Sequence, residues 1–528
     1  MKKIFTCILL LILFAGAAKA QWMYQPYSFQ FYQKLNSQVY SPSTNLHTAL
    51  KPYLITDSSA VRPLYDSLLM LNVDNSSKSW LDHLVLSGHL AQVKNKDYTF
   101  SLDYLPDLQL GREFEEPKTT WLNTRGYQLY GTIGSNFFFY SSGYENQGKF
   151  ANYETEYIAA TGMVPGEAYN KSSSTTEPDW SYVTALIGYQ PNKAVTLVLG
   201  EDKTFIGDGY RSVLLSDYAA SYPLFRLTVN LGKDVQYMAM WAYMEDQDAV
   251  QFNSFSNNRR KWAGFHYLDW NITSRASIGF FNAIVSEEAN DQGQGHGFDV
   301  NYIDPVLFSS SIGPKSQAPD HTLLGLNAKY KILDKTAIYG QFLYDQASSP
   351  GNNNSRNAWQ AGFRGADLFK VKGFNYLFEY NTSTPYTYAN QYPIVSYSEL
   401  GEPLADPLGA NFKEFVGILN YSIGKFDLQG QINYAQYGLN IGSANFGKDI
   451  TLADNVNLPT PLGTTGQGMA TTLKYAEGTI AYLLNPKYNL RIEIGGLVRQ
   501  ESNSLSDNKT VMFTFGLRST FRDLYHDF

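Results

Sequence analysis

The residues best equipped for chemistry are gathered in one segment, 200–226, which reads GEDKTFIGDGYRSVLLSDYAASYPLFR. Its glycines permit tight backbone turns, and its polar side chains include Asp208, Tyr210, Arg211 and Asp217. The segment is not a phosphate-binding P-loop, because no Gly-Lys-Ser/Thr follows the glycines and no helix is expected there. It suits either the binding of a hydroxyl-rich ligand or a loop whose Arg and Asp residues pair with each other.

Other loop residues have the types that sugar binding needs. Aromatic rings cover the apolar faces of sugars, and planar polar groups bond the hydroxyls. The further candidates of these two kinds are Asn301, Tyr302, Asp304, Tyr386, Tyr388 and Asn411. The alternative is that the loop aromatics pack a plug or an interfacial belt.

Acid/base and metal chemistry have little support. The nearest acid/base group is Asp320 with His321, together with His266, and seven scattered histidines make such a neighbour common by chance. No His-Glu-x-x-His spacing occurs. We therefore expect no catalytic residues, no metal and no cofactor.

Composition excludes several classes of protein. Aromatic residues make up 15% of the 528 residues and charged residues 17%, which disfavours disorder. A formal net charge of −7 disfavours nucleic-acid binding. No apolar run after the N-terminus is long enough for a membrane-spanning helix.

Residues 1–20 have the features of an export signal. Lys2 and Lys3 precede a short apolar stretch, and Ala18-Lys19-Ala20 resembles a cleavage site. The single cysteine, Cys7, lies inside this stretch, so the mature chain is expected to have none. Removing three lysines leaves a net charge of −10.

From about residue 98 onward, apolar and polar residues alternate with period two. One clear stretch is 326–332, where Leu326, Ala328, Tyr330 and Ile332 alternate with polar residues. Such alternation predicts strands with two different faces, but a soluble sandwich would show it too.

The connections between these stretches favour a membrane barrel. Tight turns such as 191–193 and 485–487 alternate with long polar segments, including 201–222, 286–321 and 382–412. Short periplasmic turns opposite long outer loops are typical of outer-membrane barrels. We predict an all-β, antiparallel transmembrane barrel of about eighteen strands over 96–528, with the C-terminus back at the periplasmic rim. If loops 201–222 and 286–321 fold inward, the protein should conduct poorly.

Residues 21–95 differ from the rest of the chain. The segments 59–71 and 79–90 have the spacing of two short amphipathic helices. We expect a helical region at the periplasmic mouth of the barrel.

The segment 200–226 resembles the signature of the Wzi-type capsule assembly family, particularly its branch related to the gliding-motility outer-membrane protein RemB. Matching stretches follow in family order: 123–126, 144–147, 297–305, 323–327, 385–388 and 403–415. Tyr218 and Asp406 depart from the family pattern, which has Asn and His there. The resemblance implies an eighteen-stranded barrel with a periplasmic helical element and a role in holding surface polysaccharide.

The leading functional hypothesis is a non-enzymatic protein of the Gram-negative outer membrane that binds or helps attach surface polysaccharide. Its expected partners are that polysaccharide, outer-membrane lipid and other envelope proteins, with no nucleic acid. The alternatives are a gliding-motility or protein-secretion accessory and a porin-like diffusion channel. A barrel hydrolase is the least favoured alternative, because the sequence offers no convincing catalytic triad. An eighteen-stranded barrel is wide enough for a water-filled lumen unless loops fill it.

Overall fold

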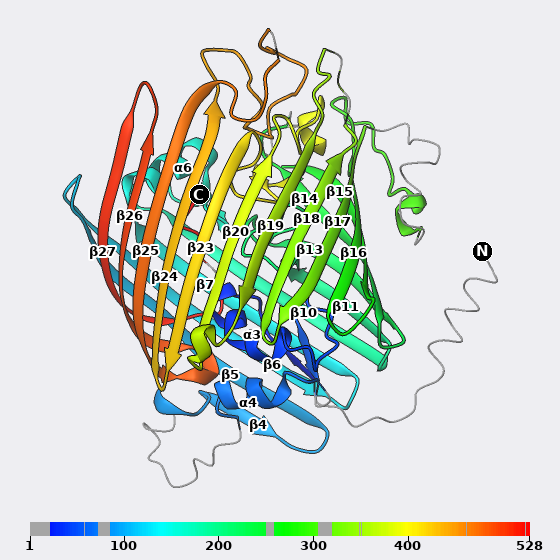
Figure 1. Ribbon diagram of the computed structural model, residues 1–528, viewed down its shortest axis with the longest axis vertical. Coiled ribbons are helices and arrows are strands. Elements are labelled where there is room, and N and C mark those ends of the chain that lie inside the picture. Colours follow the sequence, from blue (N-terminus) through cyan, green and yellow to red (C-terminus); the bar gives the residue numbers. More distant parts are fainter. Residues whose placement is uncertain are drawn as a thin grey trace.

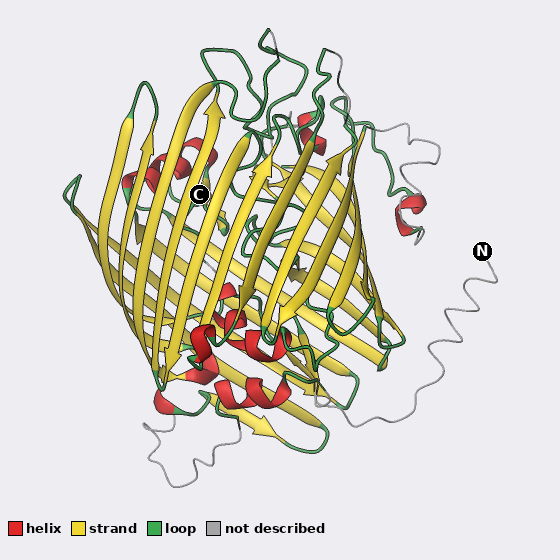
Figure 2. Cartoon of the chain, viewed as in Figure 1, coloured by secondary structure: helices red, strands yellow, loops and turns green. Residues whose placement is uncertain are grey.

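The computed structural model describes residues 22–56, 59–71, 85–249, 258–304, 319–347, 349, 351–460, 462–522 and 524–528. Within these residues the chain forms a closed antiparallel barrel of eighteen strands (Figures 1 and 2). The predicted fold class is confirmed. The strands of the wall are β5 (Tyr98–Glu113), β6 (Lys118–Ile133), β7 (Phe137–Lys149), β10 (Asp179–Asn192), β11 (Val195–Asp202), β13 (Tyr222–Leu231), β14 (Val235–Asp246), β15 (Arg259–Asn271), β16 (Ala276–Glu287), β17 (Asp320–Leu333), β18 (Thr336–Asp345), β19 (Asn357–Gly365), β20 (Phe374–Ser383), β23 (Phe412–Ile423), β24 (Phe426–Leu439), β25 (Met469–Asn485), β26 (Leu490–Ser502) and β27 (Asp507–Ser519).

The last strand closes the barrel onto the first. β27 pairs with the upper half of β5, with Phe513 opposite Arg112 and Thr514 opposite Gly111. A short strand, β4 (Ala91–Lys94), pairs with the lower end of β5. Closure leaves no open edge in the wall, so every strand finds its backbone partners within the sheet.

Each strand has one outward and one inward face. On β17, Leu326 and Tyr330 are 41% and 48% exposed, whereas Asn327 and Lys329 between them are buried. Apolar outward side chains suit lipid, and polar inward ones suit a lumen that is filled with protein or water. The protein is therefore a barrel of the Gram-negative outer membrane.

The two rims carry the two expected kinds of connection. Tight turns such as 193–194 and 424–425 join strands at one rim, and long segments such as 203–221 and 384–411 join them at the other. Short turns mark the periplasmic rim. Three further connections also lie at the extracellular rim and were not predicted: the short hairpins 114–117 and 503–506 and the long segment 346–356.

The first part of the chain contains short elements rather than two helices. These are β1 (Trp22–Tyr24), α2 (Phe29–Tyr32), η1 (Gln33–Leu35), α3 (Asn36–Val39), β2 (Leu50–Lys51), β3 (Leu54–Thr56) and α4 (Arg62–Leu68). Helix α4 lies inside the predicted segment 59–71, and α2 and α3 were not expected. The first half of the predicted helix 79–90 falls outside the described residues, as does the predicted signal, 1–20. Among the described residues, no helix is long and apolar enough to cross a membrane.

The N-terminal segment enters the lumen at the periplasmic end (Figure 1). Lys34 pairs with Asp427 of β24 at 2.7 Å, and His47 lies 2.7 Å from Asp269 of β15. Its apolar side chains, Tyr65 among them, form a separate small core together with Phe521 of the C-terminal tail. The segment thus plugs the barrel by polar bonds to the wall and by its own packing.

Extracellular connections fill the upper part of the lumen. The segment 203–221 folds inward and its strand β12 (Phe205–Ile206) pairs with β2 of the N-terminal segment. The segment 384–411 packs beside it through a shared apolar core. The remaining short elements are α6 (Asn152–Thr161), β8 (Met163–Val164), β9 (Ala168–Tyr169), η2 (Val300–Ile303), η3 (Leu368–Lys370), η4 (Pro393–Val395), β21 (Ser398–Glu399), β22 (Glu402–Pro403) and η5 (Pro486–Tyr488).

The inward folding considered for segment 286–321 does not occur at residues 298–302. Residues 298–302 lie against the outward faces of β14 and β15, and η2 stands outside the barrel (Figure 2). The indole N–H of Trp241 donates to the Tyr302 carbonyl at 2.8 Å, and Nε2 of His266 lies 3.1 Å from the same oxygen. These outward polar groups would lack partners in lipid, which accounts for the position of the segment. Residues 305–318 fall outside the described residues.

The chain does not stop at the periplasmic rim. After β27 ends at Ser519, the last residues turn into the lumen and climb toward its centre, where Figure 1 marks the C end. Tyr525 donates to Asp217 at 2.8 Å, and Asp527 is buried. The expected return to the periplasmic rim therefore holds for the end of β27. It does not hold for the tail, because polar and charged tail residues bind partners inside the lumen.

We predict that an outward charge destabilises the wall far more than an inward one. Ile432 lies halfway along β24 and is 53% exposed on the outward face. Ile432→Arg should lower the free energy of unfolding by about 2–4 kcal/mol if the residue lies near the bilayer midplane. Unfolding in lipid vesicles by urea measures this change.

Thr479 on β25 provides the matched control, because it borders interior cavities. Thr479→Lys should fold with a much smaller loss. Equal losses for the two variants would show that the assignment of faces is wrong.

Candidate functional site

Arg211 stands at the centre of a buried charge cluster in the lumen. Its guanidinium lies 3.1 Å from Glu414 of β23 and 3.0 Å from Asp527 of the C-terminal tail. It also donates to the Asp527 backbone carbonyl at 2.7 Å, and its side chain is 1% exposed. One arginine therefore ties an extracellular connection to the wall and to the tail.

The backbone beside Arg211 binds a second wall carboxylate. The amide N–H groups of Tyr210 and Arg211 each donate to Glu379 of β20 at 3.0 Å. A Cβ at Gly209 would lie 2.2 Å from a Glu379 oxygen, so only glycine lets the carboxylate approach this closely. The glycines of the segment therefore serve an internal anchor.

Asp208 and Asp217 bond within the lumen as well. Asp208 accepts hydrogen bonds from Tyr40 at 3.0 Å and from Thr48 at 2.6 Å, both in the N-terminal segment. Burial alone would raise the pKa of Asp208, but nearby Lys329 and Lys51 outweigh it and lower the pKa. Asp217 accepts the Tyr525 hydroxyl, so each carboxylate joins the connection to a different terminal segment.

Tyr386 and Asn411 are buried under the extracellular surface. Both are fully shielded from solvent and both adopt positive φ. The Tyr386 hydroxyl donates to the Asn445 carbonyl at 2.7 Å. The Asn411 amide donates to three backbone carbonyls, and its oxygen accepts the Gly466 N–H at 2.7 Å. These side chains hold one extracellular connection against another.

The candidates of segment 297–305 are remote from this group. Tyr302 is 6% exposed and lies on the outer wall, and its ring meets Phe298 edge-on at 5.6 Å. Asp304 follows on the same outer segment, and the side chain of Asn301 falls outside the described residues. The structure thus brings Asp208, Tyr210, Arg211 and Asp217 together and separates these three residues from them.

The two histidines that sequence analysis singled out, His266 and His321, have structural partners. His321 is fully buried between Asp345, at 2.8 Å, and the Val395 carbonyl, at 3.1 Å. His266 lies on the outer face, so the two do not form one site. Across the described part of the chain, no group of three or more His, Cys, Asp and Glu residues is placed to hold a metal ion.

Three extracellular connections form one surface, which we call the cap: the described residues of 346–356, 384–411 and 440–468. Arg356 and Asp454 form a fully buried ion pair, and Asp454 also accepts from Ser349. Arg356 donates to the Ala389 carbonyl at 3.2 Å, and the Asn352 amide donates to the Asp454 carbonyl at 3.1 Å. One ion pair therefore fixes all three connections to each other.

The outer side of the cap exposes polar and aromatic groups. Tyr392 is 49% exposed, and its N–H donates to Asn390 at 3.1 Å, which fixes the backbone beneath the ring. The exposed asparagines Asn353 and Asn457 lie on the other two connections. The sequence pattern did not indicate these three residues, because exposure depends on how the connections fold. Their only signal is the asparagine-rich composition of 352–354 and 455–457.

Comparison with known proteins shows what the chain is similar to. No protein-family model and no curated protein matches it. Among solved structures it is similar to Wzi, an outer-membrane protein involved in group 1 capsule assembly in Escherichia coli and described as a carbohydrate-binding β-barrel. The identity is 12% and the TM-score 0.54, over 94% of this chain and 99% of Wzi. OprD of Pseudomonas aeruginosa follows with 10% identity and a TM-score of 0.42, over 79% of this chain and 94% of OprD.

The chain has the fold of Wzi. Because identity is low, this likeness establishes the arrangement of the barrel and not a shared activity. The resemblance read from the motifs is confirmed for the fold, and the RemB-like branch stays a prediction.

Glu402 of β22 joins three extracellular segments beneath the surface. Its carboxylate accepts the Gly166 N–H at 2.8 Å, the Tyr157 hydroxyl at 3.1 Å and the Ala220 N–H at 3.2 Å. Burial raises the pKa of Glu402 to about 7, although nearby Lys203 opposes the shift.

We predict that removing Arg211 unfolds the interior network. Arg211→Met would leave Glu414 and Asp527 buried without their cation, which should cost about 3–5 kcal/mol. Limited proteolysis of the reconstituted protein should then cut within 203–221, where the parent chain is resistant. Arg112→Met, on the exposed outer face, is the control and should leave the pattern unchanged. Full resistance of Arg211→Met would contradict the anchoring role.

We also predict that the Glu402 contacts weaken as pH rises. The folded-state pKa of about 7 lies above the ordinary 4.5, so the folded state favours the protonated carboxyl. The free energy of local unfolding around Glu402 should be highest below about pH 4.5. It should fall by about 3 kcal/mol as pH rises through 7. Hydrogen exchange at 157–166 and 220, corrected for intrinsic rates, measures it. Glu402→Gln should abolish the dependence, and a dependence that persists in that variant would assign it to another group, such as the neighbouring Glu399.

Proposed function

We propose that the protein holds surface polysaccharide at the cap and performs no reaction on it. The observation that carries this proposal is the fixed extracellular surface: three connections locked by Arg356 and Asp454, with Tyr392 exposed on top. A rigid aromatic ring beside amide groups suits a sugar, because little conformational entropy is lost on binding. A long repeating polymer can add many weak contacts of this kind.

The likeness to Wzi supports the proposal. Wzi is described as a carbohydrate-binding barrel, and the two chains correspond over nearly their whole lengths. The buried sequence candidates then act indirectly. Asp208, Tyr210, Arg211 and Asp217 hold the interior beneath the cap, and Tyr386 and Asn411 hold the cap connections together.

A porin-like channel is the second candidate, because an eighteen-stranded barrel can enclose an aqueous pore. The dense interior favours the binding function: the N-terminal segment, 203–221, 384–411 and the C-terminal tail all occupy the lumen. The motility or secretion role rests on the RemB-like resemblance alone. Conductance in planar bilayers and the phenotype of a deletion strain separate these alternatives.

We predict that Tyr392→Ala weakens binding of the cell's own surface polysaccharide about tenfold, because loss of a stacking platform removes roughly 0.5–1.5 kcal/mol at each repeated contact. Biolayer interferometry with immobilised protein and purified polysaccharide measures this change in affinity. Tyr98→Ala is the matched control, because Tyr98 is 46% exposed at the opposite rim. Its binding should equal that of the parent chain.

The deletion strain supplies the cellular readout. It should release polysaccharide into the medium without a loss of synthesis, and the parent gene should restore attachment. If all polysaccharide stays attached while surface movement or secretion fails, the accessory role replaces the proposal. Large steady conductance by the intact protein would instead favour the channel.

A further inference from the structure

A cavity lies far from the cap, between the N-terminal segment and the wall at the tight-turn rim. Its volume is about 380 Å³, within the range of small-molecule sites, roughly 300–1,000 Å³. The wall contributes residues of β7, β10, β11, β13 and β14, and the N-terminal segment contributes residues between 24 and 61. Exposed Lys193 and Lys233 mark its edge in two periplasmic turns.

The charge of this cavity is opposite to that of the protein. The chain carries 48 Asp and Glu against 41 Lys and Arg, yet none of the described residues that line the cavity is acidic. Its lining cations are Lys193, Lys233 and Arg226. The carboxylates behind the lining are engaged: Asp269 lies 2.7 Å from His47, and Asp234 accepts from Asn45 at 2.7 Å. The cavity therefore favours an anion.

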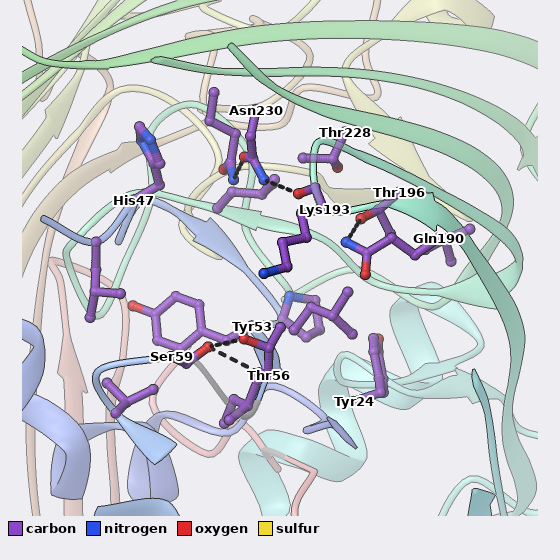
Figure 3. Close-up of a pocket in the computed structure, with 18 of the residues that line it drawn as sticks. Tyr24, His47, Tyr53, Thr56, Ser59, Gln190, Lys193, Thr196, Thr228 and Asn230 are labelled. Atoms are coloured by element: carbon purple, nitrogen blue, oxygen red, sulfur yellow. Dashed lines mark hydrogen bonds between the residues drawn. The ribbon is translucent and has the colours of Figure 1, made fainter. Parts of the chain in front are cut away.

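Two polar groups point into the cavity without a protein partner. Figure 3 shows the Lys193 ammonium reaching between Tyr53 and Gln190, and no hydrogen bond or ion pair holds it among the described residues. Gln190 is 4% exposed; its amide N–H donates to Thr196 at 3.1 Å, while its buried oxygen has no hydrogen-bond partner. An unpaired buried amide oxygen is unfavourable unless a ligand or water donates to it.

The rest of the lining adds hydroxyls, amides and apolar surface. Thr228, Asn230 and Gln236 lie on the wall side, and Gln236 donates to Asn230 at 2.9 Å. Tyr24, Tyr53 and Phe138 supply rings, with aliphatic side chains between them. A ligand for this lining needs an anionic group for Lys193, a donor for the Gln190 oxygen and both polar and apolar faces.

We propose that this cavity is a periplasm-facing binding site for a sugar acid. The sugar carboxylate pairs with Lys193, a ring hydroxyl donates to the Gln190 oxygen, and the apolar ring face packs on the aromatic side chains. The proposal is independent of the cap: the cap can fail to bind polysaccharide while this site still binds its ligand.

The test uses the full chain in detergent micelles and isothermal titration with D-glucuronate. The parent protein should bind it, and Lys193→Gln should weaken binding at least tenfold by removing the charge while keeping a polar side chain. Gln190→Leu should weaken binding as well. Lys425→Gln, in another turn of the same rim, is the matched control and should bind as the parent does. The heat-modified gel shift confirms that each variant is folded.

Four results would overturn the proposal. If glucuronate shows no measurable binding, the cavity is not a sugar-acid site. If Lys425→Gln loses as much affinity as Lys193→Gln, the effect comes from overall charge and not from this cavity. D-glucose bound as tightly as glucuronate removes the role of the anion. Inorganic phosphate or an acetylated glutamate dipeptide bound more tightly than glucuronate replaces the sugar acid with another ligand class.

Discussion

An eighteen-stranded barrel encloses more space than its own inward side chains can fill. In this protein the space is taken by four other parts of the chain: the N-terminal segment, two extracellular connections and the C-terminal tail. Each must bring groups that satisfy a polar wall. The polar residues of the wall point inward, because lipid requires apolar side chains at the outward positions.

Buried charges are therefore paired across segments that are distant in sequence. Arg211 binds a wall carboxylate and the tail, and Asp208 binds the N-terminal segment. Arg356 and Asp454 do the same for the cap. A buried charge is unfavourable alone and acceptable when paired, so each pair selects one arrangement of the loops. The fixed cap and the periplasmic cavity are both consequences of this packing.

Much of the fold could be predicted because lipid imposes a strict local pattern. Leu326 and Ile432 alternate with polar neighbours, and turn residues mark one rim. The path of a loop has no such signature. Segment 203–221 folds inward, whereas 298–302 lies outside the barrel. The outer position of 298–302 depends on Trp241 and His266, two polar side chains that face outward from the wall and contact it.

The candidate site was harder to predict than the fold. Tyr210, Arg211 and Asn411 were chosen for side-chain type, and type does not distinguish a ligand contact from an internal anchor. Their partners lie up to 317 residues away in the sequence. Tyr392 and Gln190 gave no signal in the sequence, because exposure and an unpaired oxygen appear only once the chain is folded.

The proposed binding of polysaccharide at the cap can be tested at the extracellular surface itself. Hydroxyl-radical footprinting of the reconstituted protein, with and without purified surface polysaccharide, should show protection centred on Tyr392 and the cap, with the tight-turn rim unchanged. Protection confined to other surfaces, or none at saturating polysaccharide, would contradict it.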